Sequence, residues 1–197
     1  MIKRIFDAFF SGLGLIVLAP FLLIIAIIIK CDSKGPILFI QPRVGLHNKN
    51  FNIFKFRTMY VESENKGLLT IGNRDSRITN VGYFLRRYKI DEFPQLINII
   101  KGDMSFVGPR PELRKYVNYY TKEDLIVLSV KPGITGLASI EYRNEVELLK
   151  SAKDPEAFFI QSIIPEKNKL NIEYIAKKSF WFDLKLIAIT ILKVVTK

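Results

Sequence analysis

The residues best suited to chemistry in this 197-residue chain are two adjacent carboxylates, Asp91 and Glu92, which follow the cations Arg86, Arg87 and Lys89. At the first turn of a helix, two such carboxylates can converge on one cation, or one can attack a substrate while the other holds metal. A helix N-cap with a charge-favourable neighbour is the alternative interpretation. The upstream cations favour chemistry, because they can neutralise a phosphate or lower the pKa of a carboxylate.

Three further cations are candidates for binding a phosphate. Arg110 lies between Pro109 and Pro111. Because proline fixes φ, the backbone on both sides is stiff, and the guanidinium loses little entropy when it binds a phosphate with two hydrogen bonds. Lys55 and Arg57 lie two residues apart in a predicted strand, so they share one of its faces. A solvated outer face is the alternative for that pair.

Composition limits both the class of protein and the metals it could hold. The chain has one cysteine, Cys31, and one histidine, His47, which excludes a disulfide-stapled scaffold and any metal site with two imidazoles. A metal ion must therefore be held by carboxylates, as Mg²⁺, Mn²⁺ and Ca²⁺ are. A net charge of +11 with 49% hydrophobic residues excludes a disordered chain and indicates a negatively charged partner, either nucleic acid, a phosphorylated metabolite or anionic lipid.

The N-terminal segment is apolar enough to enter a membrane, since residues 8–29 carry no charge. Pro20 lies near its middle, and cations flank both ends, so the charge pattern does not place the two ends on opposite sides. A helix bent at the proline would enter and leave by the same face. We therefore expect a re-entrant membrane hairpin over residues 1–34, in preference to a straight span or a buried core helix, and a compact cytosolic domain over residues 35–197.

The elements that must position the candidate residues are mainly helical, in an α+β fold. Apolar runs at residues 37–40 and 51–59, joined by a polar turn, predict a small β-hairpin. Helices are predicted over residues 81–88, from 91 or 92 to 100, over 113–120, over 145–176 and over 180–195. We expect a glycine C-cap at Gly102 and breaks near Pro155 and at Pro165. The last helix begins with an aromatic cluster, which favours an amphipathic helix at the membrane interface over an ordinary core helix.

Several motifs occur in order across nearly the whole chain. They are FKFRTM at residues 54–59, LRR at 85–87, DEFPQL at 91–96, GDMSFVGPRP at 102–111 and KPGITG at 131–136. Together with the apolar N-terminal segment and its central proline, they closely resemble the small monotopic phosphoglycosyl transferases, which are bacterial sugar transferases. One departure concerns the bend, where Ala19 precedes Pro20 and members of that family often have serine.

The resemblance implies transfer of a sugar-1-phosphate from a UDP-sugar to a polyprenyl phosphate such as undecaprenyl phosphate, with release of UMP. This would be the first membrane step in assembling a bacterial glycan or glycoconjugate. By motif, Asp91 corresponds to a nucleophile that forms a covalent aspartyl-phosphosugar intermediate, and Glu92 to a ligand of Mg²⁺. Arg110 corresponds to a position that binds the nucleotide or its phosphate.

Lys55, Arg57 and Arg86 are further candidate substrate-binding residues. We expect an enzyme at the cytoplasmic face of the bacterial inner membrane, with a UDP-sugar, a polyprenyl phosphate and membrane lipids as partners and no nucleic acid. The alternative is a non-enzymatic, membrane-tethered protein that binds nucleic acid or anionic lipid. That alternative leaves the adjacent carboxylates Asp91 and Glu92 unexplained.

Overall fold

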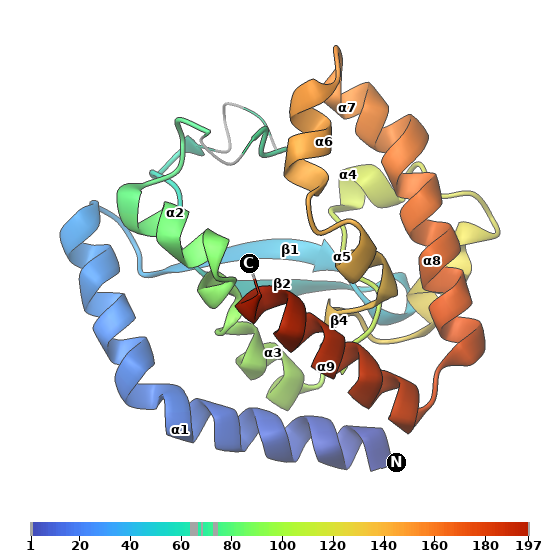
Figure 1. The fold of residues 1–197 in the computed structure, drawn as a ribbon, viewed down its shortest axis with the longest axis horizontal. Helices are drawn as coiled ribbons and strands as arrows, with labels where there is room; N and C mark the ends of the chain where they lie inside the picture. Colours follow the sequence, from blue (N-terminus) through green and yellow to red (C-terminus); the bar gives the residue numbers. More distant parts are fainter. Residues whose placement is uncertain (1, 64–66, 68, 73–74, 197) are drawn as a thin grey trace.

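The computed structural model describes residues 2–63, 67, 69–72 and 75–196, and it is mainly helical with two small sheets at its centre (Figure 1). The longer helices are α1 (Ile2–Asp32), α2 (Asn80–Arg87), α3 (Gln95–Lys101), α6 (Glu145–Ser151), α8 (Ile164–Lys177) and α9 (Phe180–Val195). The shorter ones are α4 (Arg114–Val117), α5 (Leu137–Glu141) and α7 (Pro155–Phe158), with 3₁₀-helices η1 (Leu46–Asn48), η3 (Ile90–Glu92) and η4 (Asp124–Ser129). The predicted mainly helical class with a small sheet is confirmed.

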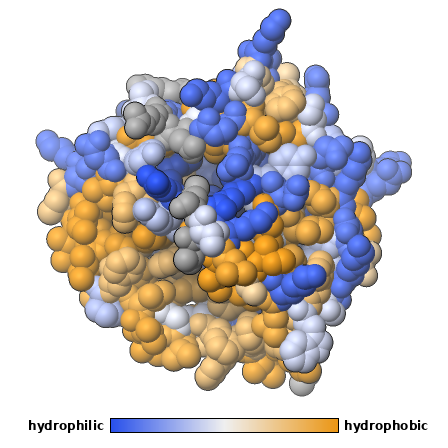
Figure 2. Space-filling model, viewed as in Figure 1, coloured by the Kyte–Doolittle hydropathy of each residue, from blue (hydrophilic) through white to orange (hydrophobic). Residues whose placement is uncertain are grey.

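Helix α1 remains helical through Pro20, and Figure 1 shows it as a bent helix along the edge of the molecule. On one side, Ile25 and Ile29 are buried against Phe56 and Leu85. The opposite side is apolar and exposed, and only 11% of the most apolar 18-residue window is buried. Figure 2 shows hydrophobic side chains gathered at this edge, whereas hydrophilic ones gather at the centre and upper right. By length and composition, α1 is the one helix in the described part of the chain that could cross a membrane.

Strands β1 (Leu38–Val44) and β2 (Asn50–Phe56) form the predicted antiparallel hairpin, with Leu38 opposite Phe56 and Val44 opposite Asn50. The first strand is longer than predicted because it continues past Pro42, a residue that can be accommodated in the edge strand of a two-stranded sheet. The second strand ends at Phe56 and not at residue 59.

A second sheet joins two motifs that lie far apart in the sequence. Strands β3 (Ser105–Val107) and β4 (Gly133–Thr135) pair in parallel, so that the motifs at residues 102–111 and 131–136 lie side by side. Beyond the strands, the Gly108 N–H donates to Thr135 O at 2.9 Å and the Gly133 N–H donates to Pro109 O at 2.9 Å. A Cβ on either glycine would collide with the opposite backbone, so glycine permits this close approach.

The C-terminal part is a series of helices whose junctions agree only partly with prediction. A break precedes Pro155, where the Asp154 carboxylate caps α7. The break predicted at Pro165 is wrong, because the π-helix η5 (Phe159–Ile163) continues directly into α8. Proline is tolerated in the first turn of a helix, and the π turn changes the hydrogen-bonding pattern just before it. The helix predicted over 113–120 is shorter, as α4, while α9 has the predicted bounds.

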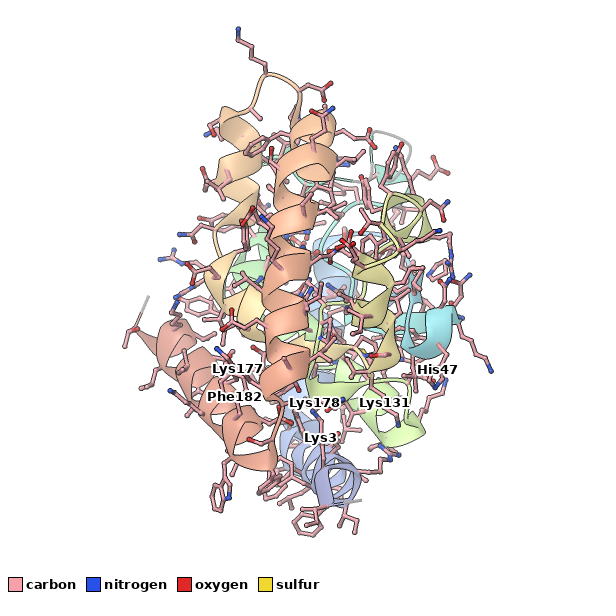
Figure 3. All side chains as sticks on the ribbon, turned by 90° about the vertical axis from the view of Figure 1, so that its right-hand side faces the viewer. Lys3, His47, Lys131, Lys177, Lys178 and Phe182 are labelled. Carbon is pink, nitrogen blue, oxygen red and sulfur yellow. The ribbon has the colours of Figure 1, made fainter. Side chains whose placement is uncertain are left out.

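Helix α9 has both an internal and an external face. Leu186 is buried against Val107 and Tyr174, while Trp181 at its first turn is 77% exposed. Asp183 is also buried, and it accepts hydrogen bonds from the Lys3 ammonium at 2.6 Å and the Tyr174 hydroxyl at 2.7 Å. These contacts tie the beginnings of α1 and α9 together, and Figure 3 shows Lys3 and Phe182 near Lys177 at the end of α8 and near Lys178 just beyond it.

Candidate active site

The two adjacent carboxylates lie in a tight turn between α2 and α3. Lys89 adopts a left-handed conformation (φ 59°), and Asp91 and Glu92 follow it in η3. The predicted continuous helix from 91 or 92 is therefore replaced by a 3₁₀ turn followed by α3. Pro94 accounts for this, since it has no N–H to continue the hydrogen-bonded ladder, and it becomes the N-cap of α3. At the other end, Gly102 is the left-handed C-cap (φ 91°), as predicted.

Asn98 fixes α3 against β2. Its side chain is fully buried, with Oδ1 accepting from the Phe54 N–H at 3.0 Å and Nδ2 donating to Asn52 O at 2.7 Å. These bonds pair α3 with the free edge of β2, and so they set Glu92 opposite Lys55. Asn98 was not predicted to have this role, and its signal in the sequence is that of the one amide side chain in the otherwise apolar run of residues 96–100.

Glu92 is held by two of the predicted cations. Its Oε1 atom lies 3.1 Å from Lys55 Nζ and 2.5 Å from Arg110 Nη2, and its Oε2 atom lies 3.4 Å from Arg110 Nη1. Burial alone would raise the pKa of Glu92, but Arg110 and Lys55 more than offset it and hold the pKa well below its usual range. The same contact raises the pKa of Arg110. Arg110 and Lys55 therefore favour the charged form of Glu92.

Asp91 occupies a different environment although it is the adjacent residue. It is as buried as Glu92, at 6% exposed, and its Oδ1 atom has no hydrogen-bond partner within the described part of the chain. Burial raises the pKa of Asp91, and the negative charge of Glu92 raises it further. Adjacent carboxyl groups whose pKa values are driven apart are suited to different roles. Asp91 thus has an oxygen without a hydrogen-bond partner among the described residues, whereas Glu92 is held by ion pairs.

Burial lowers the pKa of two cations near the site, Arg86 and Lys55. Arg86, in the last turn of α2, is close enough to Asp91 and Glu92 that both oppose the lowering of its pKa by burial. Lys55 is likewise affected by burial, which lowers its pKa to about 8 against the opposing effect of Glu92. A lysine in this range can exchange its proton near neutral pH.

Arg57 lies outside this cluster and binds carbonyl groups at the end of α1 and just beyond it. Its guanidinium donates to Ser33 O and Lys34 O, each at 2.6 Å, and to Ile29 O at 3.3 Å. Ile29 lies in the last turn of α1, while Ser33 and Lys34 lie just beyond its end at Asp32, where carbonyl groups need partners from outside the helix. The structure therefore brings together Asp91, Glu92, Lys55, Arg86 and Arg110, and it does not add Arg57 to them.

Comparisons with known proteins show the family to which the chain belongs. A family model described as "Bacterial sugar transferase" matches residues 1–197. The chain is 39% identical over 196 residues to the undecaprenyl-phosphate glucose phosphotransferase of Komagataeibacter xylinus, covering 96% of this chain and 35% of the relative. It is 36% identical over 197 residues to the UDP-glucose:undecaprenyl-phosphate glucose-1-phosphate transferase of Escherichia coli K12, covering 98% and 40%.

A third relative acts on a different sugar by its name. The UDP-N-acetylgalactosamine-undecaprenyl-phosphate N-acetylgalactosaminephosphotransferase of Aeromonas hydrophila is 35% identical over 198 residues, covering 99% of this chain and 44% of the relative. The chain thus spans less than half the length of these three relatives. In all three, the match includes nearly every residue of this chain, including those around Asp91 and Glu92. The chain therefore belongs to the bacterial sugar transferase family.

Proposed function

We propose that this chain transfers a sugar-1-phosphate from a UDP-sugar to a polyprenyl phosphate such as undecaprenyl phosphate, and releases UMP through a covalent aspartyl intermediate. The named substrates of the relatives support the reaction class. The observation that carries the mechanism is the unlike state of two adjacent buried carboxylates. Glu92 is bound by Lys55 and Arg110, while an oxygen of Asp91 is without a partner.

In the first step, the Asp91 carboxylate attacks the phosphorus that carries the sugar. A bond forms between the Asp91 oxygen and phosphorus, and the phosphorus–oxygen bond to UMP breaks, so that UMP leaves with the bonding electrons. In the second step, an oxygen of the polyprenyl phosphate attacks the same phosphorus, and the Asp91 carboxylate is released. Arg110 and Lys55, which both contact Glu92, would donate to phosphate oxygens as charge develops on them.

The residues present suit Mg²⁺. The described residues contain no group of three or more histidine, cysteine, aspartate or glutamate side chains that could enclose a metal ion. Mg²⁺ at phosphoryl-transfer sites needs only one or two carboxylates, because water and substrate phosphates complete its coordination. Glu92 Oε2, whose contact with Arg110 is long at 3.4 Å, would provide such a donor, and Glu92 is the proposed metal ligand. When bound, the ion would offset negative charge on the diphosphate.

Helix α1 would place this chemistry at a membrane surface. We propose that α1 enters and leaves the cytoplasmic face of the bacterial inner membrane, because Pro20 interrupts its hydrogen bonding and cations flank both ends. Ala19 has no hydroxyl group to bind a freed carbonyl, so the bend would depend on the proline alone. The phosphate of a polyprenyl acceptor lies at the same surface. Non-enzymatic binding of nucleic acid or anionic lipid would give the buried carboxylates no role.

Intact-protein mass spectrometry tests the covalent step directly. Purified protein mixed with UDP-glucose or UDP-N-acetylgalactosamine, Mg²⁺ and no lipid acceptor is expected to gain one sugar-phosphate mass with one of the two donors and to release an equal amount of UMP. Asp91→Asn, which is nearly isosteric, should form no adduct. Glu92→Gln is the matched control, and it should regain some adduct at high Mg²⁺ concentration. An adduct on Asp91→Asn would contradict the assignment of the nucleophile, and UMP release that requires the acceptor would indicate direct transfer.

A further inference from the structure

A second ion-pair cluster lies behind the loop that carries Arg110. Lys167 of α8 is 7% exposed in its side chain, and its Nζ atom lies 2.7 Å from Glu112 Oε1 and 3.0 Å from Glu145 Oε2. Arg43 of β1 approaches the other oxygen of Glu112, at 3.9 Å. We call Arg43, Glu112, Glu145 and Lys167 the clamp. Figure 3 shows α8, which supplies Lys167, passing across this side of the molecule.

Lys167 and Glu112 are both buried, and each is favoured in its charged form by the other. Burial would lower the pKa of Lys167, but Glu112 and Glu145 raise it overall. Burial would raise the pKa of Glu112, but Lys167 and Arg43 lower it overall. Buried ion pairs contribute little to stability compared with well-packed apolar residues, so stability alone does not account for charges at these positions. A role in orientation does.

The clamp holds the backbone that follows Arg110, and Gly133 of β4 holds the backbone that precedes it. Glu112 is two residues beyond Arg110, and its carbonyl accepts from the Val44 N–H at 3.0 Å. Arg43 Nη1 donates to Pro111 O at 3.2 Å, while Pro109 O accepts from the Gly133 N–H at 2.9 Å. Because the flanking prolines fix φ, a loop held at these points presents the Arg110 guanidinium in one direction. That direction is toward Glu92, at 2.5 Å.

We propose that Lys167 is a positioning residue, which binds Glu112 and thereby holds the Arg110 loop in the orientation that the transfer reaction requires. This inference rests on the proposed function, because one of its tests measures UMP release. Lys167 lies outside every motif that relates the sequence to phosphoglycosyl transferases, and it does not contact Asp91 or Glu92. Its effect would pass through Arg110.

The test compares variants of the full chain in detergent by UMP release and thermal melting. Lys167→Met alone leaves Glu112 buried with less compensation, so the main variant is Lys167→Met/Glu112→Gln, which removes both charges. Its kcat/KM for the UDP-sugar is expected to fall by about tenfold or more, which is within the range of couplings within one ion-pair network. Lys167→Arg, which keeps the charge, should retain most activity. Lys169→Met is the matched control, since Lys169 is an exposed lysine of the same helix paired with Glu166.

A double-mutant cycle separates positioning from a general structural effect. In an Arg110→Ala background, the Lys167→Met/Glu112→Gln change should lower kcat/KM by less than about twofold, because the residue through which it acts is absent. An equal loss in both backgrounds, or full activity of the charge-free variant while wild type is active, would overturn the proposal.

Hydrogen exchange supplies a measurement that does not depend on turnover. The peptide containing Arg110 should exchange faster in Lys167→Met/Glu112→Gln than in wild type or Lys169→Met. Unchanged exchange there would overturn the positioning role even if the activity assay failed. A wild type that releases no UMP under any donor would instead contradict the proposed function, so the two failures are distinguishable.

Discussion

Replacing Asn98 with leucine should destabilise the protein by removing the contacts that hold α3 against β2. The substitution keeps a similar volume but leaves the Phe54 N–H and Asn52 O without their side-chain partners, whose bonds measure 3.0 and 2.7 Å. A backbone group left unsatisfied in a buried position costs about 1–3 kcal/mol. Asn52 is exposed and water can replace part of its bond, so the expected loss is about 2–4 kcal/mol. For a chain of this length, that corresponds to a melting temperature lower by about 4–16 °C.

Thermal melting in detergent, followed by circular dichroism, measures this loss. Asn118→Leu is the matched control, because Asn118 is exposed at the end of α4 and should melt like wild type. Asn98→Asp separates the two bonds, since it keeps the acceptor for Phe54 but loses the donor and places a second carboxylate near Asp103, whose Oδ2 now lies 3.4 Å from Asn98 Nδ2. It should be destabilised at least as much as Asn98→Leu. If Asn98→Leu melted with the control, the amide would not be what joins α3 to β2, and the reasoning would be refuted.

Three other predictions concern Lys55, Arg57 and helix α1. Activity should fall as pH rises through about 8, where Lys55 loses its proton, and Lys55→Arg should move this fall to higher pH. The free energy of unfolding should instead rise between pH about 8 and 10.5, because Lys55 binds its proton more strongly in the unfolded chain than in the folded one. Arg57→Met should lower the melting temperature while leaving the KM for the UDP-sugar unchanged, whereas a raised KM with normal melting would indicate substrate binding. An impermeant maleimide should label neither the exposed Cys31 nor Ile2→Cys in a Cys31→Ser background until cells are permeabilised, and labelling of one flank from outside would exclude a re-entrant α1.

The sequence predicted the composition of the site better than its geometry. Motif order and charge identified Asp91, Glu92, Lys55 and Arg110, which the structure places together. Arg57 was grouped with Lys55 because alternation along a strand shows which side chains share a face, but not which element packs on it. Here the end of α1 covers Arg57.

Elements were predictable where local chemistry determined them and less so where long-range pairing did. Gly102 and Asp154 have their effects within one turn of helix, and both helix ends were found where expected. The β3–β4 pair joins residues about thirty positions apart through three-residue strands, which are too short to give an alternating pattern. The role of Lys167 also depends on long-range contacts, because its carboxylate partners Glu112 and Glu145 come from two other segments, and so it could not be recognised from the sequence.

Helix α1 has two apolar sides, one packed on the protein and one exposed, and this affects how the protein can be made. Its residues Ile25 and Ile29 complete the apolar cluster around Phe56 and Leu85, while the opposite side of the same helix is exposed and apolar. A chain outside a bilayer would leave the exposed apolar side of α1 in water. A chain without α1 would instead expose Phe56 and Leu85. If α1 enters a membrane as proposed, synthesis, membrane delivery and folding are linked, and molecules that miss the membrane would become substrates for chaperones and proteases.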